Sequence, residues 1–382
     1  MKKTLILAGV LSAFAISAQA QSSVTLYGSL DAGLLFANNA NGQLWQQGSG
    51  AMSYNYFGLR GAEDLGGGLK AIFKLESGFD LNNGGFRQNN AGFNRQSYVG
   101  LESNQFGTLT LGRQYDSMVD YLSPLSATGQ GFGNNLAAHP FDNDNLGQSF
   151  SINNAVKYTS VDYSGLQFGG LYGFSNQAGG FSNGRAWSVG AAYNNGPLKF
   201  AAGYLQLNNS GNLSTNGAAS DNQNIAARLQ RTYGAGAGYT YGPADVNFVW
   251  THSQMDGISS AASGVSLPGL DGLNLHLNNY EINGAYHATP ALAFNASYTF
   301  TDGTVTGATN GSPKWHTFVL GTDYALSKRT DVYLEGVYQH ASGSIGVDSN
   351  GAAVANVASI NMIAPSSTNN QVAATVGLRH RF

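Results

Sequence analysis

A serine between two glycines is the first pattern in this sequence that could carry out covalent chemistry. Gly180, Ser182 and Gly184 match the spacing G-x-S-x-G, which in hydrolases presents a nucleophilic serine on a sharp turn. That turn must connect a strand to a helix, whereas these residues lie in a polar loop between two predicted strands. The pattern therefore indicates an ordinary loop rather than an active site.

The acidic residues and histidines do not show the spacing of a metal site. Asp142 and Asp144 begin a segment that imitates a calcium-binding loop, but its fifth position is Leu146 and its twelfth is Asn153, where a bidentate glutamate is required. The histidines lack the H-x-x-x-H spacing of a zinc site; they are His139, His252, His276, His287, His316, His340 and His380. The sequence therefore predicts no catalytic residue, no metal and no cofactor, and the protein is not expected to be an enzyme.

The composition narrows the class of protein that could hold these residues. Charged residues make up 10% of the 382 residues, against about 25% in a typical soluble domain, while Gly reaches 52 residues and Cys is absent. The 20 Tyr, 20 Phe and 4 Trp argue against disorder, and the glycines show no three-residue collagen period. A net charge of −3 without a basic run argues against a nucleic-acid partner. These features favour a β-rich protein that tolerates few charges.

The first twenty residues resemble a secretory signal peptide. Lys2 and Lys3 form a positive segment, residues 5–16 are apolar, and Ala18-Gln19-Ala20 is a small-x-small cleavage site. Removal of 1–20 takes away two lysines, so the formal charge changes from −3 to −5. No later stretch approaches the ~18 apolar residues of a spanning helix. The mature protein is therefore predicted to be exported and to cover residues 21–382.

Most of the mature chain alternates between polar and apolar residues with a period of two, which is typical of β-strands that present different faces to different surroundings. In one such run Phe294, Ala296 and Tyr298 alternate with Asn295 and Ser297. Each run is close to the ten residues that cross a bilayer when a strand is tilted. The predicted strands are sixteen: 23–37, 54–63, 69–80, 96–104, 107–116, 153–161, 165–176, 185–194, 198–208, 231–241, 244–255, 278–289, 291–301, 314–326, 330–341 and 371–382.

The connections between these strands alternate strictly between short turns and long polar segments. The long ones are 38–53, 81–95, 117–152, 177–184, 209–230, 256–277, 302–313 and 342–370. Short periplasmic turns, long external loops and an even strand number are the signature of an outer-membrane β-barrel. A barrel of this size encloses an aqueous channel. A secreted β-sandwich or β-solenoid is the alternative, but it explains neither the loop rhythm nor the shortage of charge.

The long connection 117–152 differs from an ordinary external loop. It carries apolar residues such as Tyr121, Leu122 and Leu125 together with Asp120, Asp142 and Asp144. A loop of this length with apolar residues is expected to be packed and functional rather than extended. We expect it to fold into the barrel, narrow the interior and place carboxylates opposite basic wall residues; an external surface position is the alternative.

Six segments carry a resemblance to a known family. They are Ser23–Gly28 (SVTLYG), Phe57–Gly66 (FGLRGAEDLG), Asn94–Leu101 (NRQSYVGL), Leu111–Asp116 (LGRQYD), Asn153–Tyr158 (NNAVKY) and Val376–Phe382 (VGLRHRF). With these segments the whole mature chain resembles the Gram-negative general porins, in particular the trimeric type of the neisserial and related proteobacterial branch. The resemblance implies an all-β, sixteen-stranded transmembrane barrel, a third loop folded inside as the constriction, and a homotrimer with one channel per subunit. It also implies that the C-terminal strand with Phe382 is the signal read by the barrel-assembly machinery.

Candidate residues for the channel wall come partly from strand parity and partly from the resemblance. The alternation of side chains along the strands predicts that five charged residues point inward: Arg60, Lys70, Lys74, Glu76 and Lys157. The resemblance places Arg95, Arg113 and Asp116 near the constriction, with Asp120, Asp142 and Asp144 on the inward loop. The family typically has three wall arginines facing that loop; here Arg95 occupies one of these positions, while Tyr56 and Ser151 stand at the other two. This departure predicts little anion preference.

The sequence thus predicts a passive, water-filled channel for small hydrophilic solutes and ions in the Gram-negative outer membrane, where charged side chains facing the water set the ion preference. Its expected partners are further copies of itself, outer-membrane lipid and lipopolysaccharide, the barrel-assembly machinery and the solutes. The alternatives are a substrate-selective channel on the same fold, a membrane enzyme built on a barrel, and an adhesin whose barrel only anchors its loops.

Overall fold

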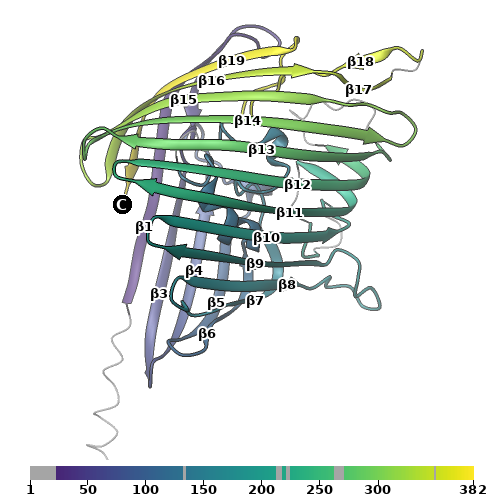
Figure 1. Cartoon of the computed structure of the whole chain (residues 1–382). Coiled ribbons are helices and arrows are strands. Elements are labelled where there is room, and N and C mark those ends of the chain that lie inside the picture. Colours follow the sequence, from purple (N-terminus) through teal and green to yellow (C-terminus); the bar gives the residue numbers. More distant parts are fainter. Residues whose placement is uncertain (1–22, 132–134, 212–216, 221–223, 262–270, 348–349) are drawn as a thin grey trace, which may run out of the picture.

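The chain forms a closed antiparallel β-barrel (Figure 1). The computed structural model describes residues 23–131, 135–211, 217–220, 224–261, 271–347 and 350–382. The sheet closes because β1 (Ser23–Ala37) pairs with β19 (Asn370–Arg381) at one edge and with the strands that follow β1 at the other. The predicted signal peptide, residues 1–20, lies outside the described residues.

The remaining strands of the barrel follow in chain order, each antiparallel to its neighbour. They are β2 (Leu44–Ser49), β3 (Tyr56–Gly66), β4 (Leu69–Gly78), β5 (Gln96–Ser103), β6 (Gly107–Gln114), β7 (Ile152–Thr159), β8 (Leu166–Gly173), β9 (Ala186–Asn195), β10 (Leu198–Asn208), β11 (Ile225–Tyr241), β12 (Ala244–Ala261), β13 (Asn274–His287), β14 (Leu292–Thr306), β15 (Lys314–Ala325) and β16 (Thr330–Ser342). A separate hairpin in the last long loop consists of β17 (Ser344–Val347) and β18 (Ala353–Ala355).

The 17 strands of the sheet make a barrel of sixteen, because β2 and β3 are two halves of one barrel strand. β1 pairs with β3 along its first half and with β2 along its second. Between the halves the buried Asp31 of β1 holds the chain: its carboxylate accepts hydrogen bonds from the backbone N–H groups of Met52 (2.8 Å) and Ser53 (2.6 Å) and from the Tyr333 hydroxyl (2.6 Å). The predicted number of strands is confirmed, but β2 corrects the predicted loop 38–53, because a six-residue strand next to glycine-rich chain gives little periodicity.

Replacement of Asp31 by alanine is expected to destabilise the barrel at this interruption. It removes the acceptor of three hydrogen bonds, two of them buried, from the Met52 and Ser53 N–H groups and the Tyr333 hydroxyl; we expect a loss of about 3 kcal/mol. The temperature at which the folded form converts to the slower-migrating unfolded form in detergent gels measures this loss. Asp64→Ala, at an exposed turn carboxylate, is the control. Equal conversion temperatures for the two variants would contradict the role given to Asp31.

Side chains alternate between the two faces of the barrel as the sequence pattern predicts. On β14, Asn295, Ser297 and Thr299 are buried and point inward, whereas Phe294 is 49% exposed and points outward. A barrel in a membrane has this arrangement because hydrocarbon surrounds the outside and water fills the inside. The apolar residues of the alternating strands are therefore the outer surface of the barrel.

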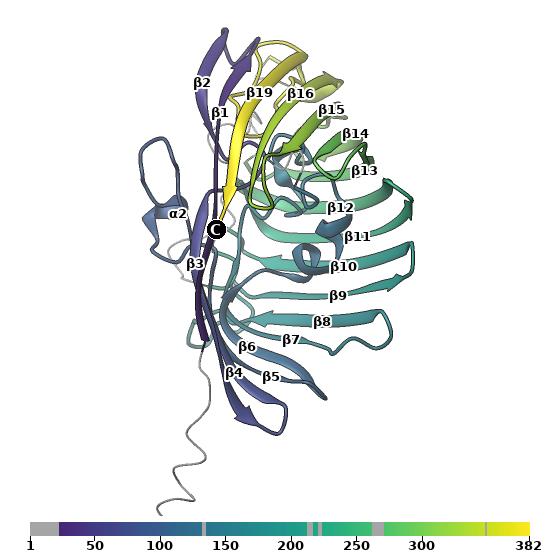
Figure 2. The same ribbon diagram turned by 90° about the vertical axis from the view of Figure 1, so that its left-hand side faces the viewer.

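The wall of the barrel is taller on one side than on the other (Figures 1 and 2). β5, β6, β7 and β8 have 8 residues each, whereas β11 has 17 and β12 has 18. The taller strands reach into segments that the sequence predicted as loops, since β11 begins at Ile225 and β12 ends at Ala261. On the side of β3, the loop after β4 projects away from the barrel and carries the short helix α2 (Arg87–Asn90) (Figure 2).

The segment between β6 and β7 lies inside the barrel and contains short helical turns. They are η2 (Met118–Leu122), η3 (Ser123–Leu125) and η4 (Pro140–Asp142). This inward loop confirms the position predicted for 117–152. Within the described part of the chain, no helix has the length and apolar character needed to cross a bilayer.

Candidate functional site

The inward loop packs against the inner faces of β9, β10 and β11, where glycines make room for it. Gly190, Gly203 and Gly234 face one another in register across these three strands. A Cβ at Gly190 would lie 2.6 Å from the ring of Tyr121, and one at Gly203 would lie 2.9 Å from Sδ of Met118. The glycines therefore allow η2 to approach the backbone of the wall, and Met118 joins a buried apolar cluster with wall residues.

A buried histidine joins the far end of the loop to the wall. His139 Nδ1 lies 2.6 Å from Asp144 Oδ2 on the loop, and its Nε2 lies 3.0 Å from Glu281 Oε2 on β13. Burial alone would lower the pKa of His139, but the two carboxylates outweigh it and raise the pKa to about 10. Thr251 of β12 donates a further hydrogen bond of 2.6 Å to Asp144, and Glu281 accepts one of 2.8 Å from the Ala127 N–H. We call His139, Asp144 and Glu281 the loop latch.

The other carboxylates of the loop are also buried. Asp142 accepts hydrogen bonds from the N–H of Gly147 (2.8 Å) and from the N–H of Ser149 (3.1 Å), and burial together with Asp144 raises its pKa to about 6. Asp116 accepts from Met118 N–H and from the Asn145 amide, and burial raises its pKa to about 6. The segment that imitates a calcium loop is thus held by its own backbone. No group of three or more acidic or histidine residues in the described ranges could hold a metal ion.

Asp120 is the loop carboxylate that meets a basic wall residue directly. It forms an ion pair with Lys157 of β7, whose ammonium group also donates a hydrogen bond of 3.0 Å to the carbonyl of Tyr115. Asp142, by contrast, accepts hydrogen bonds from the backbone of the loop, and Asp144 bonds to Thr251 of β12 and to His139. The loop therefore turns most of its negative charge away from water.

A cluster of charged and aromatic side chains covers the wall formed by β3, β4 and the start of β5. Glu76 is its centre: Arg95 Nε lies 2.6 Å from Glu76 Oε1, Lys74 Nζ lies 3.3 Å from Oε2, and the Tyr27 hydroxyl donates to Oε2 at 2.8 Å. The Arg95 guanidinium also lies 4.9 to 5.6 Å from the ring centres of three tyrosines, Tyr54, Tyr56 and Tyr115. Stacking on several rings fixes the direction of the guanidinium.

Arg95 also reaches the inward loop, and a pocket opens beside it. Its Nη2 donates a hydrogen bond of 2.9 Å to Gln148 Oε1. The pocket has a volume of about 270 Å³ and is lined by side chains of the wall, of the inward loop and of the outer loops, including Arg87, Arg95, Gln148, Asn224 and Asn361. Arg87 stacks over Tyr54 at 5.1 Å and has no ion-pair partner among the described residues. The pocket therefore presents positive charge and amides to water.

Comparison with known proteins identifies the family. A family model described as Gram-negative porin matches residues 7–344.

This chain belongs to the Gram-negative porins.

An outer membrane porin protein of Bordetella pertussis is 34% identical over 88% of this chain and 94% of its own length, and outer membrane porin protein 32 of Delftia acidovorans is 30% identical over the full length of both. The solved structure of an anion-selective porin from Comamonas acidovorans covers 95% of this chain and 100% of its own with a TM-score of 0.71; at 24% identity it shows the fold alone. The family, its relatives and the barrel establish an outer-membrane channel for passive diffusion. The family is one of non-enzymatic channels.

The porin brings together Arg95, Tyr56 and Ser151, the three residues that the resemblance predicted at the positions of the wall arginines. The ring of Tyr56 stacks under the Arg95 guanidinium at 4.9 Å, and the Ser151 hydroxyl donates to the carbonyl of Arg95 at 2.7 Å. Arg113, which the sequence placed only by resemblance, lies next to them and donates to Asn94 O and to Gln88 Oε1, each at 2.8 Å. Their role in the channel stays a prediction.

Of three other predicted residues, Arg60 lies at the edge of the Glu76 cluster, and Lys70 and Phe382 lie away from it. Arg60 is exposed and stacks over Tyr27 at 5.1 Å, and Lys70 pairs with Glu102 at 3.4 Å near the short turns. Phe382 continues the last strand, because its N–H and C=O exchange hydrogen bonds of 3.1 and 3.0 Å with Gly28 of β1. The Phe382 contacts lie at the seam where β19 meets β1; they leave the predicted assembly signal untested.

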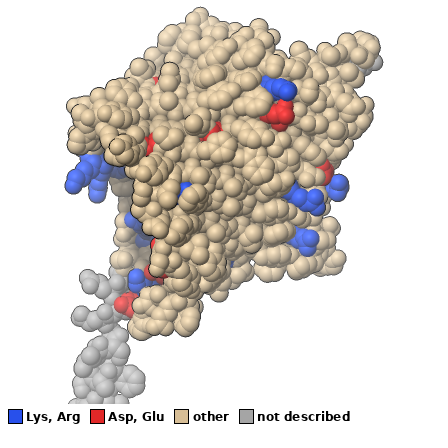
Figure 3. Space-filling view, viewed as in Figure 1, with Lys and Arg blue, Asp and Glu red and all other residues tan. Residues whose placement is uncertain are grey.

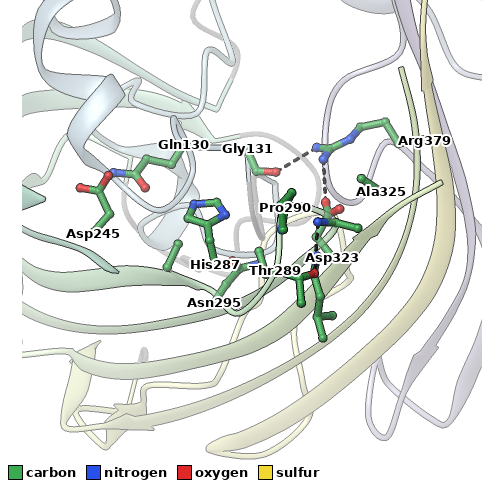
Figure 4. Close-up of a pocket in the computed structure, with 14 residues that line it drawn as sticks. Gln130, Gly131, Asp245, His287, Thr289, Pro290, Asn295, Asp323, Ala325 and Arg379 are labelled. Atoms are coloured by element: carbon green, nitrogen blue, oxygen red, sulfur yellow. Dashed lines mark hydrogen bonds and ion pairs between the residues drawn. The ribbon is translucent and has the colours of Figure 1, made fainter. Parts of the chain in front are cut away.

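Sequence reasoning missed the residues that anchor the loop. Figure 4 shows one of them, Arg379 of β19, which donates to the carbonyl of Gly131 on the loop at 2.9 Å and pairs with Asp323 at 2.8 Å. A second bond of 3.0 Å joins it to Asp331. Neither Arg379 nor His139 stands out by spacing, because the contacts that join the loop to the wall, Arg379 to Gly131 and His139 to Glu281, connect residues more than a hundred positions apart in the chain. Arg87 lies in the predicted loop 81–95, where strand alternation gives no information on side-chain direction.

Proposed function

We propose that solutes cross this porin between the inward loop and the basic wall of β3 to β5, and that the loop forms the constriction. The observation that carries this proposal is the uneven anchoring of the loop. Apolar packing, the latch and Arg379 hold it to β9–β13 and β19. Toward β3 to β5 and the α2 loop the contacts are individual hydrogen bonds, such as Arg95 to Gln148 and Gln88 to the Ser149 carbonyl, and a pocket of about 270 Å³ opens between the loop and Arg87. Free space beside a fixed loop is what a diffusion path requires.

Removal of residues 125–145 should raise single-channel conductance, because it deletes the part of the loop that occupies the interior. Planar-bilayer recordings of the purified protein measure the change. A deletion of 350–360, in the last long outer loop, is the control. Unchanged conductance of the 125–145 deletion, with normal barrel stability, would refute the proposal that the loop forms the constriction.

We propose a moderate preference for anions, in contrast to the expectation from the sequence. Two features support it: the loop carboxylates Asp116, Asp142 and Asp144 are buried, and Glu76 is the one carboxylate that the described structure pairs with Lys74 and Arg95. Together with Arg87, these side chains leave net positive charge beside the path. Charged side chains that line a water-filled path set the sign of ion selectivity.

We further propose that the working form is a homotrimer. The low wall of β5–β8, the projecting loop that carries α2, and the apolar outer residues Val99 and Leu111 support an interface on that side. Three equal conductance steps per insertion are the expected signature. The same proposal includes the cleavage of residues 1–20 as a signal peptide and a position among membrane lipid and lipopolysaccharide. It also includes recognition of Phe382 by the assembly machinery and the absence of catalysis in this chain.

A further inference from the structure

An apolar groove runs across the outer face of β12–β15, on the tall side of the barrel. Its floor consists of two small residues, Gly284 and Ala296, which pair directly across β13 and β14. Its volume is about 420 Å³, and large apolar side chains surround the floor: Val246, Ile282, Tyr298, Phe318 and Leu320. Most outward positions of these strands carry large residues, so the two small ones create a depression in the surface that faces hydrocarbon.

Rows of aromatic and histidine rings lie between this groove and the outer loops. One row crosses β9 to β13, from Trp187 through Tyr204 and Tyr233 to His252 and His276, with centroid distances of 4.7 to 6.3 Å between successive rings. A second row continues over β14 to β16, where Phe300, His316 and His340 follow at 4.9 and 6.4 Å. Aromatic girdles mark the membrane interface in such barrels. Here four of the seven histidines of the chain belong to the girdle.

The groove and the second row are directly connected. Tyr298 lines the groove with its ring, and its hydroxyl lies 2.8 Å from His316 Nδ1. His316 and Leu320 share the outward face of β15, and Leu320 pairs with Ala296 of the groove floor, so the histidine lies about 13 Å along the strand from the floor at ~3.3 Å per residue. An acyl chain in the groove would therefore have its headgroup at the level of the histidines.

The polar groups at this level can contact an anion. His340 Nδ1 lies 2.8 Å from Asn370 Oδ1, and within the described chain the Nε2 atoms of His316 and His340 have no hydrogen-bond partner. Lys314 lies two residues before His316 and pairs with Asp302 at 3.2 Å while remaining about half exposed. Figure 3 shows few charged side chains on this face, with several basic ones at the edge of the outer loops.

We propose that the groove and the His316, His340 and Lys314 side chains form one binding site for a phosphate-bearing lipid of the outer leaflet. An acyl chain would occupy the groove over Gly284 and Ala296, and a headgroup phosphate would contact the two imidazoles and the ammonium group. The spacing of the two parts suits such a lipid, and the two imidazoles and the ammonium group supply hydrogen-bond donors for its phosphate. This inference rests on the lipid partner included in the proposed function and names its site.

Lipid binding to the purified full-length protein tests the site. Native mass spectrometry with bisphosphorylated lipid A, dephosphorylated lipid A and inorganic phosphate as probes gives the affinities. We expect the phosphorylated lipid to bind about tenfold more tightly than the dephosphorylated one, a difference of about 1.4 kcal/mol. The double variant His316→Asn, His340→Asn should remove this difference. Ala296→Leu should weaken both lipids about tenfold, whereas Ala202→Leu, on the outer face of β10, should weaken neither.

Several results would overturn the inference. Wild-type affinities that neither variant changes would show that the girdle is only an interfacial belt. Displacement of the lipid by inorganic phosphate at equal concentration would show an anion site without a lipid. Loss of trimers in Ala296→Leu with normal lipid binding would assign the groove to a neighbouring subunit. Conductance is measured in parallel, because a wild-type protein that does not conduct refutes the proposed function and leaves the lipid result to be judged by itself.

Discussion

A His139→Ala channel should show a larger and strongly fluctuating current, because the inward loop loses its attachment to β13. The substitution leaves Asp144 and Glu281 as buried carboxylates without their shared cationic partner. Removal of one member of a buried ion pair costs about 3–5 kcal/mol, which raises the population of the released loop by about two to four orders of magnitude. The strands of the barrel keep their own hydrogen bonds, so the effect should be confined to the loop. Single-channel noise and mean conductance measure it.

The triple variant His139→Ala, Asp144→Asn, Glu281→Gln is the matched control. It removes the buried charges together, so the loop should be quieter than in His139→Ala even though it has lost the same histidine. If the single and triple variants fluctuate equally, the latch acts through packing of the imidazole and not through its charge. A quiet His139→Ala channel would contradict the latch itself.

The latch also predicts how the current noise depends on pH. The pKa of His139 is raised from the usual 6.5 to about 10, so its stabilisation of the loop is complete below pH 6.5 and is lost as the pH rises through 10. The pKa of Asp144 is lowered below its usual 3.8, so its contribution is present above that pH and is lost in stronger acid. Asp142 and Asp116 depend on pH in the direction opposite to Asp144. Their pKa values are raised from 3.8 to about 6, so the folded loop favours their protonated forms and loses stability as the pH rises from 3.8 through 6. Fluctuations should therefore grow between pH 6.5 and 10, and His139→Ala should lack this dependence.

The fold could be read from the sequence because a barrel in lipid imposes a local pattern. Alternation along β14 and the rhythm of short and long connections needed no long-range information, and the sixteen strands follow from them. The strand interruption between β2 and β3 could not be predicted in this way. It depends on Asp31, whose partners Met52, Ser53 and Tyr333 come together only after the barrel closes.

The candidate site was predictable in part for the same reason. Parity selects Lys74 and Glu76 as residues of one face, and the structure joins them through an ion pair. Parity cannot say which loop carboxylates reach water, because that depends on the internal folding of the loop. The sequence predicted that the carboxylates of Asp142 and Asp144 face the channel, but a backbone N–H group binds Asp142 and His139 pairs with Asp144. The expected balance of charge in the channel changed from near neutral to positive as a result.

Neutralisation of Arg95 should lower the preference of the channel for anions. At ~6 Å in water a unit charge contributes about 0.7 kcal/mol to the energy of a passing ion, which is about a threefold change in relative permeability. Arg95→Gln and Arg87→Gln should each shift the reversal potential in a salt gradient toward cations by about this factor. Glu76→Gln should shift it toward anions, because it removes the carboxylate that Arg95 and Lys74 share.

The opposite signs of these variants separate a charge effect from a change in the width of the path. A wider or narrower path alters conductance for both ions, whereas charge moves the reversal potential in the direction of the substitution. Lys328→Gln, on an exposed turn between β15 and β16, is the control and should leave the potential unchanged. Arg95→Lys keeps the charge but loses the planar group that stacks on Tyr54, Tyr56 and Tyr115. Its potential should stay near that of the wild type if charge decides selectivity, and it should match Arg95→Gln if the fixed direction of the guanidinium is what the ions sense.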